Sequence, residues 1–407
     1  MVLQLEKYEF LRKSKYYQFF RDIIVPFGFK LISKVFRNKV DDKLIVLGGY
    51  GGNLYHDNTR YLFEYLHHHT DYKVVWLSKS RKIVSDLRVK GYNAVHTLNI
   101  CAIKLLRKAR FIIITHGIYD ILPIEFSPDT QIMLTWHGTP IKKVILDEDL
   151  KFYVYSKWGR YFKLNLRYND YLDYILTPTS GSFEHEILSR AFDVPKSKVV
   201  ALGYPKLDLL FGKEESFINA VKSKFDIPMD IDKIVLYCPT FREDHTLRLP
   251  ISKQDLSQLD KLLKEINGLF LLKGHFFVQK IDFEEFKRFK VMPKEADIQE
   301  LYLITDILIT DYSSTMLDYS LLNRPILLFP YDLDQYLKLR GMYYELEEIA
   351  PGPIVENFDG LISAIKNIDA VERDFREKRM QIRDRFNKYT DGNSIQRILD
   401  FLGIEHT

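Results

Sequence analysis

Cysteine is scarce in this chain of 407 residues, which contains only Cys101 and Cys238. The two cysteines are far apart in sequence and neither belongs to a CxxC pair. The sequence therefore predicts neither a zinc site nor the disulfide framework of a small secreted protein. Such cysteine usage is typical of a reducing cytoplasm.

Long hydrophobic runs are missing as well. No apolar run approaches the roughly 18 residues that a membrane-spanning helix needs, and the N-terminus lacks the profile of a signal peptide. The 15 prolines and 19 glycines are too few for a fibrous or disordered chain. Because 46% of the residues are hydrophobic and 28% are charged, we expect a globular protein with about two domains.

Several catalytic motifs are also absent. The sequence has no GxSxG elbow, no HExxH pair and no Walker A lysine loop, so hydrolase and nucleoside triphosphatase activities lose their main support. No carboxylate pair is placed to demand a divalent ion. We expect neither a metal site nor a cofactor, and dependence on a metal ion stays open.

Positive charge is concentrated at the N-terminus. Residues 1–40 contain nine Lys or Arg and three acidic residues, a net charge of +6, so the rest of this +4 chain carries −2. Nine aromatic residues are interleaved with these cations, a mixture typical of a helix on an anionic lipid surface. We predict a helical membrane-docking segment over residues 1–40; the alternative is a helical arm packed on the body with its cations in water. Nucleic acid is not expected as a partner, since the remainder offers no extended basic track.

Short apolar runs alternate with segments of helical period from Lys43 onward, which predicts an α/β fold of parallel strands joined by crossover helices. The runs fall into two series, separated by the turn residues Gly203 and Pro205. The predicted strands are 44–47, 74–77, 111–115, 132–135 and 175–177, then 234–237, 270–272, 307–310 and 326–329. We predict domains over 41–205 and 206–385 and a C-terminal helix over 386–407. Two doubly wound halves facing each other would bind a ligand in the cleft at the strand C-termini.

One candidate site follows the buried strand at 307–310, where the chain continues as Asp311-Tyr312-Ser313-Ser314-Thr315. Hydroxyl side chains and backbone N–H groups at the start of a helix form a seat for phosphate oxygens. The alternative is a plain helix N-cap, which Ser and Thr commonly supply.

A second candidate follows the strand at 132–135, in the stretch Trp136-His137-Gly138-Thr139-Pro140. A histidine can accept a proton from an attacking hydroxyl near neutral pH. Gly138 permits close approach of a ligand to the backbone, and Lys142 and Lys143 add positive field. The alternative is a structural histidine beside a turn.

Two further strand ends of the second series carry cations. Thr240 and Arg242 follow the strand at 234–237, and Lys273 and His275 follow the strand at 270–272. The guanidinium of Arg242 suits a phosphate, whereas His275 or Lys273 could neutralise charge on a leaving phosphate.

At these residues the sequence resembles the CDP-glycerol glycerophosphotransferase family, the primases and polymerases of bacterial wall teichoic acid and related capsule polymers. The resemblance covers roughly residues 45–395. It is carried by Trp136-His137-Gly138-Thr139-Pro140-Ile141-Lys142-Lys143, Gly203-Tyr204-Pro205-Lys206-Leu207-Asp208, Leu236-Tyr237-Cys238-Pro239-Thr240-Phe241-Arg242, Thr310-Asp311-Tyr312-Ser313-Ser314, Asn323-Arg324-Pro325-Ile326, Leu339-Arg340-Gly341 and Asp391-Gly392-Asn393-Ser394.

The resemblance implies a GT-B architecture, in which two Rossmann-like domains face each other across the active site. It implies that an acceptor hydroxyl attacks the glycerol-bearing phosphorus of CDP-glycerol and expels CMP. His137 would be the general base, with His275 as the second catalytic candidate. The expected substrate-binding residues are Gly138, Thr139, Lys142, Thr240, Arg242, Asp311, Ser313, Ser314 and Arg340.

The expected acceptor is a polyprenol-linked saccharide or growing polymer, and the expected location is the cytoplasmic face of the membrane, bound peripherally. Three alternatives stay open. The donor could be CDP-ribitol, the enzyme could be a GT-B glycosyltransferase that uses a nucleotide sugar, or the chain could be a catalytically silent protein that binds lipid or polymer.

Overall fold

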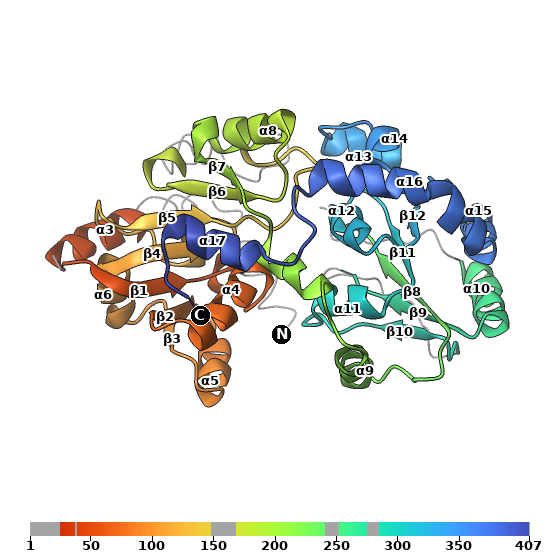
Figure 1. The fold of residues 1–407 in the computed structure, drawn as a ribbon, viewed down its shortest axis with the longest axis horizontal. Coiled ribbons are helices and arrows are strands. Elements are labelled where there is room, and N and C mark those ends of the chain that lie inside the picture. Colours follow the sequence, from red (N-terminus) through yellow and green to blue (C-terminus); the bar gives the residue numbers. More distant parts are fainter. Residues whose placement is uncertain (1–24, 37–38, 148–167, 241–251, 275–284, 407) are drawn as a thin grey trace, which may run out of the picture.

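The computed structural model describes residues 25–36, 39–147, 168–240, 252–274 and 285–406. Within these ranges the chain forms two parallel β-sheets flanked by helices (Figure 1). The first sheet has seven strands in the order β3-β2-β1-β4-β5-β6-β7. Its strands are β1 (Asp41–Leu47), β2 (Lys73–Ser78), β3 (Ala94–His96), β4 (Ala109–Ile114), β5 (Gln131–Leu134), β6 (Tyr174–Thr177) and β7 (Val199–Ala201).

The second sheet has five strands in the order β10-β9-β8-β11-β12. These strands are β8 (Lys233–Cys238), β9 (Gly268–Leu272), β10 (Phe289–Val291), β11 (Ile307–Thr310) and β12 (Ile326–Leu328). We call the part of the chain with β1–β7 the N-terminal half and the part from β8 to α16 the C-terminal half. In both sheets the strand order reverses, between β1 and β4 and between β8 and β11, and such switch points are where open α/β sheets bind ligands.

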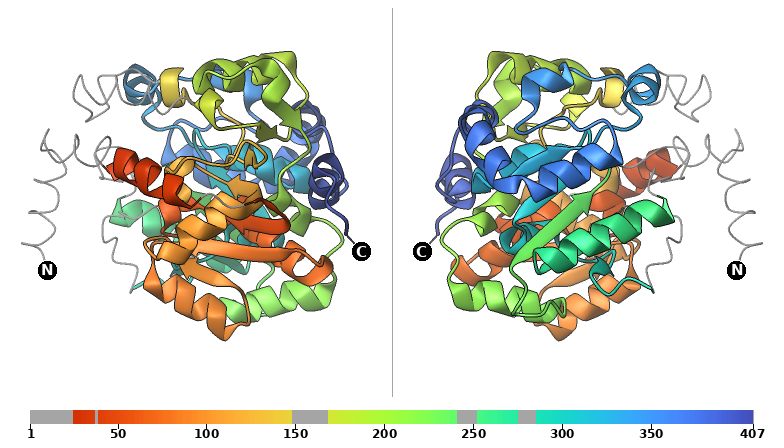
Figure 2. Two further views of the ribbon diagram at one scale, coloured as in Figure 1. Left: turned by 90° about the vertical axis from the view of Figure 1, so that its left-hand side faces the viewer. Right: turned by 90° about the vertical axis from the view of Figure 1, so that its right-hand side faces the viewer.

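Helices surround both sheets (Figure 2). Those of the N-terminal half are α3 (Val25–Val35), α4 (Asp57–His69), α5 (Arg81–Val89), α6 (Ile100–Lys108) and α8 (Ser182–Phe192). The 3-10 helix η7 (Pro205–Leu210) leads toward the C-terminal half. There follow α9 (Glu215–Lys224), α10 (Lys253–Glu265), α11 (Ile298–Ile304), α12 (Thr315–Tyr319), α13 (Leu333–Leu339), α14 (Leu346–Ile349), α15 (Phe358–Lys366), α16 (Ile368–Phe386) and α17 (Ser394–Leu402).

The prediction of an α/β fold with two series of parallel strands is confirmed. All nine predicted strands are present, and each central strand is buried on both faces, as parallel sheets covered by helices require. Three strands were not predicted: β3, β7 and β10. Each of these strands has three residues and lies at the edge of a sheet, where part of its surface stays exposed and the apolar run is short.

The segment between the two halves is packed rather than loose. Leu207 and Leu210 of η7 belong to one hydrophobic cluster with Ile398 and Leu399 of α17. The carboxylate of Asp208 in η7 accepts hydrogen bonds from the backbone N–H groups of Ser394 (3.0 Å) and Ile395 (2.9 Å), so it caps α17. The predicted domain boundary at 205/206 coincides with the start of η7, and the division into domains remains a prediction.

The C-terminal segment crosses back over the molecule. Figure 1 shows α16 over the C-terminal half and α17 over the N-terminal half. Backbone contacts fix this crossing, since the N–H of Lys388 donates to the carbonyl of Pro178 at 2.7 Å. Of the helix predicted over 386–407, the structure shows α17 at Ser394–Leu402, because a turn with Gly392 at φ +71° precedes it.

The predicted N-terminal segment is described only in part. Residues 25–35 form α3, whereas residues 1–24 lie outside the described residues. Among the helices of the described part, none has both the length and the apolar character to cross a membrane.

Candidate functional site

A cleft of about 370 Å³ lies between the two halves. Most of the predicted site residues that the structure describes line it: His137, Gly138, Thr139, Lys142, Thr240, Ser313 and Ser314. They come from the ends of β5, β8 and β11, as expected for parallel strands whose C-termini face one cleft. Arg242 and His275 follow β8 and β9 and lie outside the described residues.

The turn that carries His137 is strained. Trp136 has φ +53°, a left-handed conformation that a bulky side chain rarely adopts and that costs on the order of 1–3 kcal/mol. The side-chain amide of Asn58 donates to the carbonyl of Trp136 at 2.9 Å, and the Thr135 hydroxyl donates to the same carbonyl at 3.1 Å. Lys206 donates to the carbonyl of His137 at 2.7 Å. These contacts hold the strained turn and so orient His137.

Lys206 joins elements from both halves. Its ammonium is buried, 3.1 Å from the carboxylate of Asp318 in α12 and 3.9 Å from that of Asp57 in α4. Burial disfavours the charge, but the attraction of Asp318 and Asp57 outweighs it and raises the pKa of Lys206. The residue therefore stays charged and links the His137 turn to the helix that follows Ser313 and Ser314.

Aromatic rings pack around His137. The imidazole of His116 lies parallel to that of His137, with ring centroids 4.3 Å apart. The ring of Tyr50 packs on His116 in turn, and these two ring centroids are 4.4 Å apart. Within the described part of the chain, Nδ1 of His116 is buried and has no hydrogen-bond partner. Burial raises the pKa of Tyr50, as does Asp57, to which its hydroxyl donates at 3.4 Å.

His116 also lines the cleft and was not predicted. The sequence pattern could have predicted it, because His116 follows β4 as His137 follows β5. These two strands are paired neighbours in the sheet. Lys206, Asp57, Asn58 and Asp318 were missed for another reason. Their positions depend on contacts between distant segments, and of the four only Lys206 stands in a motif that carries the family resemblance.

The two sides of the cleft touch at Gly138. A Cβ atom at this glycine would lie 2.5 Å from Oγ of Ser314, so any side chain here would force the Ser314 hydroxyl to move. Gly138 thus allows the His137 turn to approach the hydroxyls after β11. There the Ser313 hydroxyl lies 2.8 Å from that of Thr315 and accepts the Thr315 N–H at 3.3 Å. The hydroxyl cluster predicted for a phosphate therefore faces the turn predicted for the base.

Asp311 supports the cleft from behind. It is fully buried, and its carboxylate accepts hydrogen bonds from the backbone N–H and the hydroxyl of Thr240 and from the N–H of Tyr312 (2.7 Å). Thr240 itself lines the cleft, whereas Asp311 is not among the described residues that do. The geometry places Asp311 as a residue that positions Thr240.

Arg340 lies beyond the cleft lining of the described residues, at the end of α13. The segment that follows it is joined to the Lys142 segment. The N–H of Lys143 donates to the carbonyl of Gly341 at 3.2 Å, and the N–H of Tyr343 donates to that of Ile141 at 2.9 Å. The loop of Arg340 in the C-terminal half is thereby attached to the N-terminal half.

Lys273 is the cation that the structure describes at the end of β9. It lines the cleft, and its ammonium donates to the carbonyls of Pro293 and Lys294, both at 2.8 Å. Burial lowers the pKa of Lys273. Elsewhere in the described residues, no three His, Cys, Asp or Glu side chains are grouped so that they could hold a metal ion.

The chain is similar to known proteins that transfer or polymerise glycerol phosphate. The family model described as CDP-Glycerol:Poly(glycerophosphate) glycerophosphotransferase matches residues 30–403. The teichoic acid glycerol-phosphate transferase of Staphylococcus aureus (strain NCTC 8325 / PS 47) is 33% identical over 378 residues, covering 91% of this chain and 94% of that protein. The teichoic acid poly(glycerol phosphate) polymerase of Bacillus subtilis (strain 168) is 30% identical over 387 residues, and this chain spans about half (51%) of its length.

A solved structure is also similar. It is a variant of the wall teichoic acid polymerase TagF soaked with CDPG, with a TM-score of 0.78 and 26% sequence identity. The match covers 96% of this chain and 97% of that one. The two parallel sheets and the arrangement of the halves are thus shared over nearly the whole chain.

Proposed function

The chain belongs to the CDP-glycerol:poly(glycerophosphate) glycerophosphotransferase family, and we propose that its cleft binds CDP-glycerol on the C-terminal half and the acceptor on the N-terminal half. It is a CDP-glycerol glycerophosphotransferase of teichoic acid synthesis. The observation that carries the proposal is the contact of Gly138 with Ser314, which brings the His137 turn against the hydroxyls after β11.

His137 accepts the proton of the acceptor hydroxyl in this mechanism. The hydroxyl oxygen forms a bond to the phosphorus that bears glycerol, and the bond from that phosphorus to the CMP oxygen breaks. CMP leaves, and a phosphodiester joins glycerol to the acceptor. Positioning and charge neutralisation supply most of the catalysis in such phosphoryl transfers.

The donor phosphates are assigned to the strand ends of the C-terminal half. Thr240, Ser313 and Ser314 line the cleft there, and Lys273 adds a positive charge at its wall. Arg242 and His275 follow β8 and β9 within four residues in sequence, and we keep them as donor-binding and leaving-group residues. Arg340 is kept as a residue that binds CDP-glycerol, because its loop in the C-terminal half is bonded to the segment of Lys142, which lines the cleft.

The acceptor is a polyprenol-linked saccharide or growing polymer, and the enzyme binds the cytoplasmic face of an anionic membrane through α3. One side of this helix packs on the body, where the Ser33 hydroxyl accepts the N–H of Glu125 at 3.2 Å. The opposite side exposes apolar residues: Phe27, Leu31, Ile32 and Val35. We call these four residues the α3 surface. Exposed apolar side chains beside lysines suit a lipid surface better than water, which favours docking over the alternative of a packed arm.

CMP release tests the proposal. Purified enzyme is incubated with CDP-glycerol or CDP-ribitol, with and without a lipid-linked saccharide acceptor. Acceptor-dependent CMP from CDP-glycerol is the expected result. Turnover with CDP-ribitol alone would reassign the donor, and turnover with neither donor by a folded protein would contradict the proposed reaction.

A further inference from the structure

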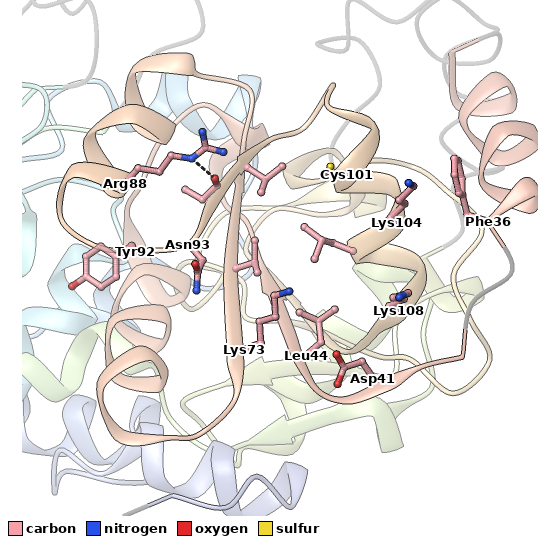
Figure 3. Close-up of a pocket in the computed structure, with 14 residues that line it drawn as sticks. Phe36, Asp41, Leu44, Lys73, Arg88, Tyr92, Asn93, Cys101, Lys104 and Lys108 are labelled. Atoms are coloured by element: carbon pink, nitrogen blue, oxygen red, sulfur yellow. Dashed lines mark hydrogen bonds between the residues drawn. The ribbon is translucent and has the colours of Figure 1, made fainter.

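A second hollow lies on the N-terminal half, apart from the cleft. It is a groove of about 800 Å³ between α6 and the outer strands of the first sheet (Figure 3). Leu44, Val75 and Ala94 form part of its floor. Figure 3 shows Arg88 and Tyr92 on one side and Lys104 and Lys108 of α6 on the other. None of these residues takes part in the proposed transfer.

The groove is strongly cationic. Lys73, Arg88, Lys104 and Lys108 line it, against the single carboxylate of Asp41. Among the described residues, no carboxylate lies within ion-pair distance of the three lysines. Lys104 and Lys108 stand one helical turn apart, where like charges repel each other. Such a concentration of uncompensated positive charge in a hollow favours the binding of an anion.

The groove adjoins the C-terminal end of α3. Phe36, which follows α3, lines the groove, and the ammonium of Lys104 lies 5.6 Å from the centre of its ring. The segment that enters α6 exposes two more apolar side chains, Leu98 and Ile100. A cationic hollow bordered by exposed apolar side chains matches an anionic amphiphile, with its charge in the hollow and its hydrocarbon on the apolar border.

We propose that this groove binds the headgroup of a single anionic glycerophospholipid, with its phosphate among Lys73, Lys104 and Lys108 and its acyl chains toward the α3 surface. The inference rests on the membrane association proposed above and adds to it a discrete lipid site. Four cations within one hollow suit one headgroup, whereas a polyanionic polymer would call for an extended basic track.

Cys101 provides a probe of the site. It lines the groove and is exposed, whereas Cys238 is buried, so a thiol-reactive, environment-sensitive fluorophore will label Cys101 selectively. We expect a blue shift and a several-fold rise in emission with vesicles that contain phosphatidylglycerol, and neither with vesicles of phosphatidylcholine alone. Charge reversal in the double variant Lys104→Glu and Lys108→Glu is expected to abolish the response. The matched control, Lys261→Glu and Lys366→Glu, makes the same change of net charge on the C-terminal half and should respond like the parent.

Other outcomes would overturn the site. If the labelled enzyme sediments with anionic vesicles but its emission does not change, the groove is wrong while membrane docking stands. If a soluble glycerol phosphate oligomer gives the same response without vesicles, the ligand is the polymer and not a lipid. CMP release with a soluble acceptor, unchanged in the double variant, shows that the variant is folded and that the transfer reaction is independent of the groove.

Discussion

The ammonium of Lys206 donates a 2.7 Å hydrogen bond to the backbone carbonyl of His137, 69 residues earlier in the chain. The same ammonium pairs with Asp318, which lies in the helix directly after the Ser313-Ser314 hydroxyls. The orientation of the proposed base is thus tied to an element of the opposite half. Catalysis and the approach of the two halves are therefore expected to respond together to changes at Lys206.

Replacement of Lys206 tests this relation. Lys206→Met leaves Asp318 buried without a partner, which costs about 3–5 kcal/mol of folding free energy, and it removes the donor to His137. We expect a lower melting temperature and a lower kcat. The double variant Lys206→Met with Asp318→Leu should recover most of the stability but not kcat. The buried charge of Asp318 is gone, and Asp57 keeps its hydrogen bonds from the Tyr50 hydroxyl and the Asn58 N–H. Recovery of both would make Lys206 a purely structural residue.

Loss of the proposed base is the direct test of His137. His137→Ala should lower turnover by about 10²–10⁴-fold, the usual contribution of general base catalysis. Calorimetry should find CDP-glycerol binding nearly intact, since the donor phosphates are assigned to the other half. Turnover close to that of the parent enzyme would rule out the assignment.

The close approach of Gly138 to Ser314 predicts that a side chain at residue 138 destabilises the protein and that a smaller residue at 314 restores part of the stability. Gly138→Ala places a methyl group 2.5 Å from Oγ of Ser314, and overpacking of this kind costs about 1–3 kcal/mol. We expect a lower melting temperature, restored in part by the additional change Ser314→Gly. Gly28→Ala is the control, because a Cβ at Gly28 meets no atom within 4 Å. A melting temperature of Gly138→Ala equal to that of the parent would show that the halves are not packed at this point.

The turn before α17 makes the folding stability depend on pH. The hydrogen bond from Arg397 lowers the pKa of Asp391, and Arg397 contacts both carboxylate oxygens, at 2.8 and 2.9 Å. A lowered pKa in the folded state means that the pair contributes stability above the ordinary pKa of 3.8 and loses it as the pH falls further. The pair is partly exposed, so the contribution is about 0.2–1 kcal/mol.

Thermal unfolding of Asp391→Asn across pH 3 to 7 checks this. The parent should be more stable than the variant at pH 7, and the difference should shrink below pH 3.8. A difference that stays constant over the whole range would exclude the ion pair as its cause.

The α3 surface predicts membrane binding. The double variant Leu31→Glu and Val35→Glu puts charge on an exposed apolar face and should reduce sedimentation with anionic vesicles at least several-fold. The double variant Met229→Glu and Val291→Glu is a matched control, because it adds the same two charges at side chains that are 54% and 50% exposed, close to the 51% of Leu31. Equal sedimentation of the two proteins would argue that α3 does not face the membrane.

The sequence predicted those features that depend on residues close together in the chain. A central parallel strand is buried on both faces, so its run of apolar residues shows in the sequence, as in β1 and β11. His137 was found because it directly follows such a strand. Asn58 was not found, since its contact with Trp136 joins residues 78 positions apart and depends on how α4 is placed against β5. The sequence of a helix does not indicate which distant carbonyl a polar side chain in it will bond to.

The chain passes between the halves twice, through η7 and through the residues that join α16 to α17. Asp208 fastens these two passages to each other by its hydrogen bonds to the start of α17. On the far side of the cleft, the N–H of Tyr343 bonds to the carbonyl of Ile141, and Lys206 pairs with Asp318 between these ties. The halves are therefore fastened on both sides of the cleft, and the turn of His137 is held in register with the hydroxyl of Ser314 by the protein itself.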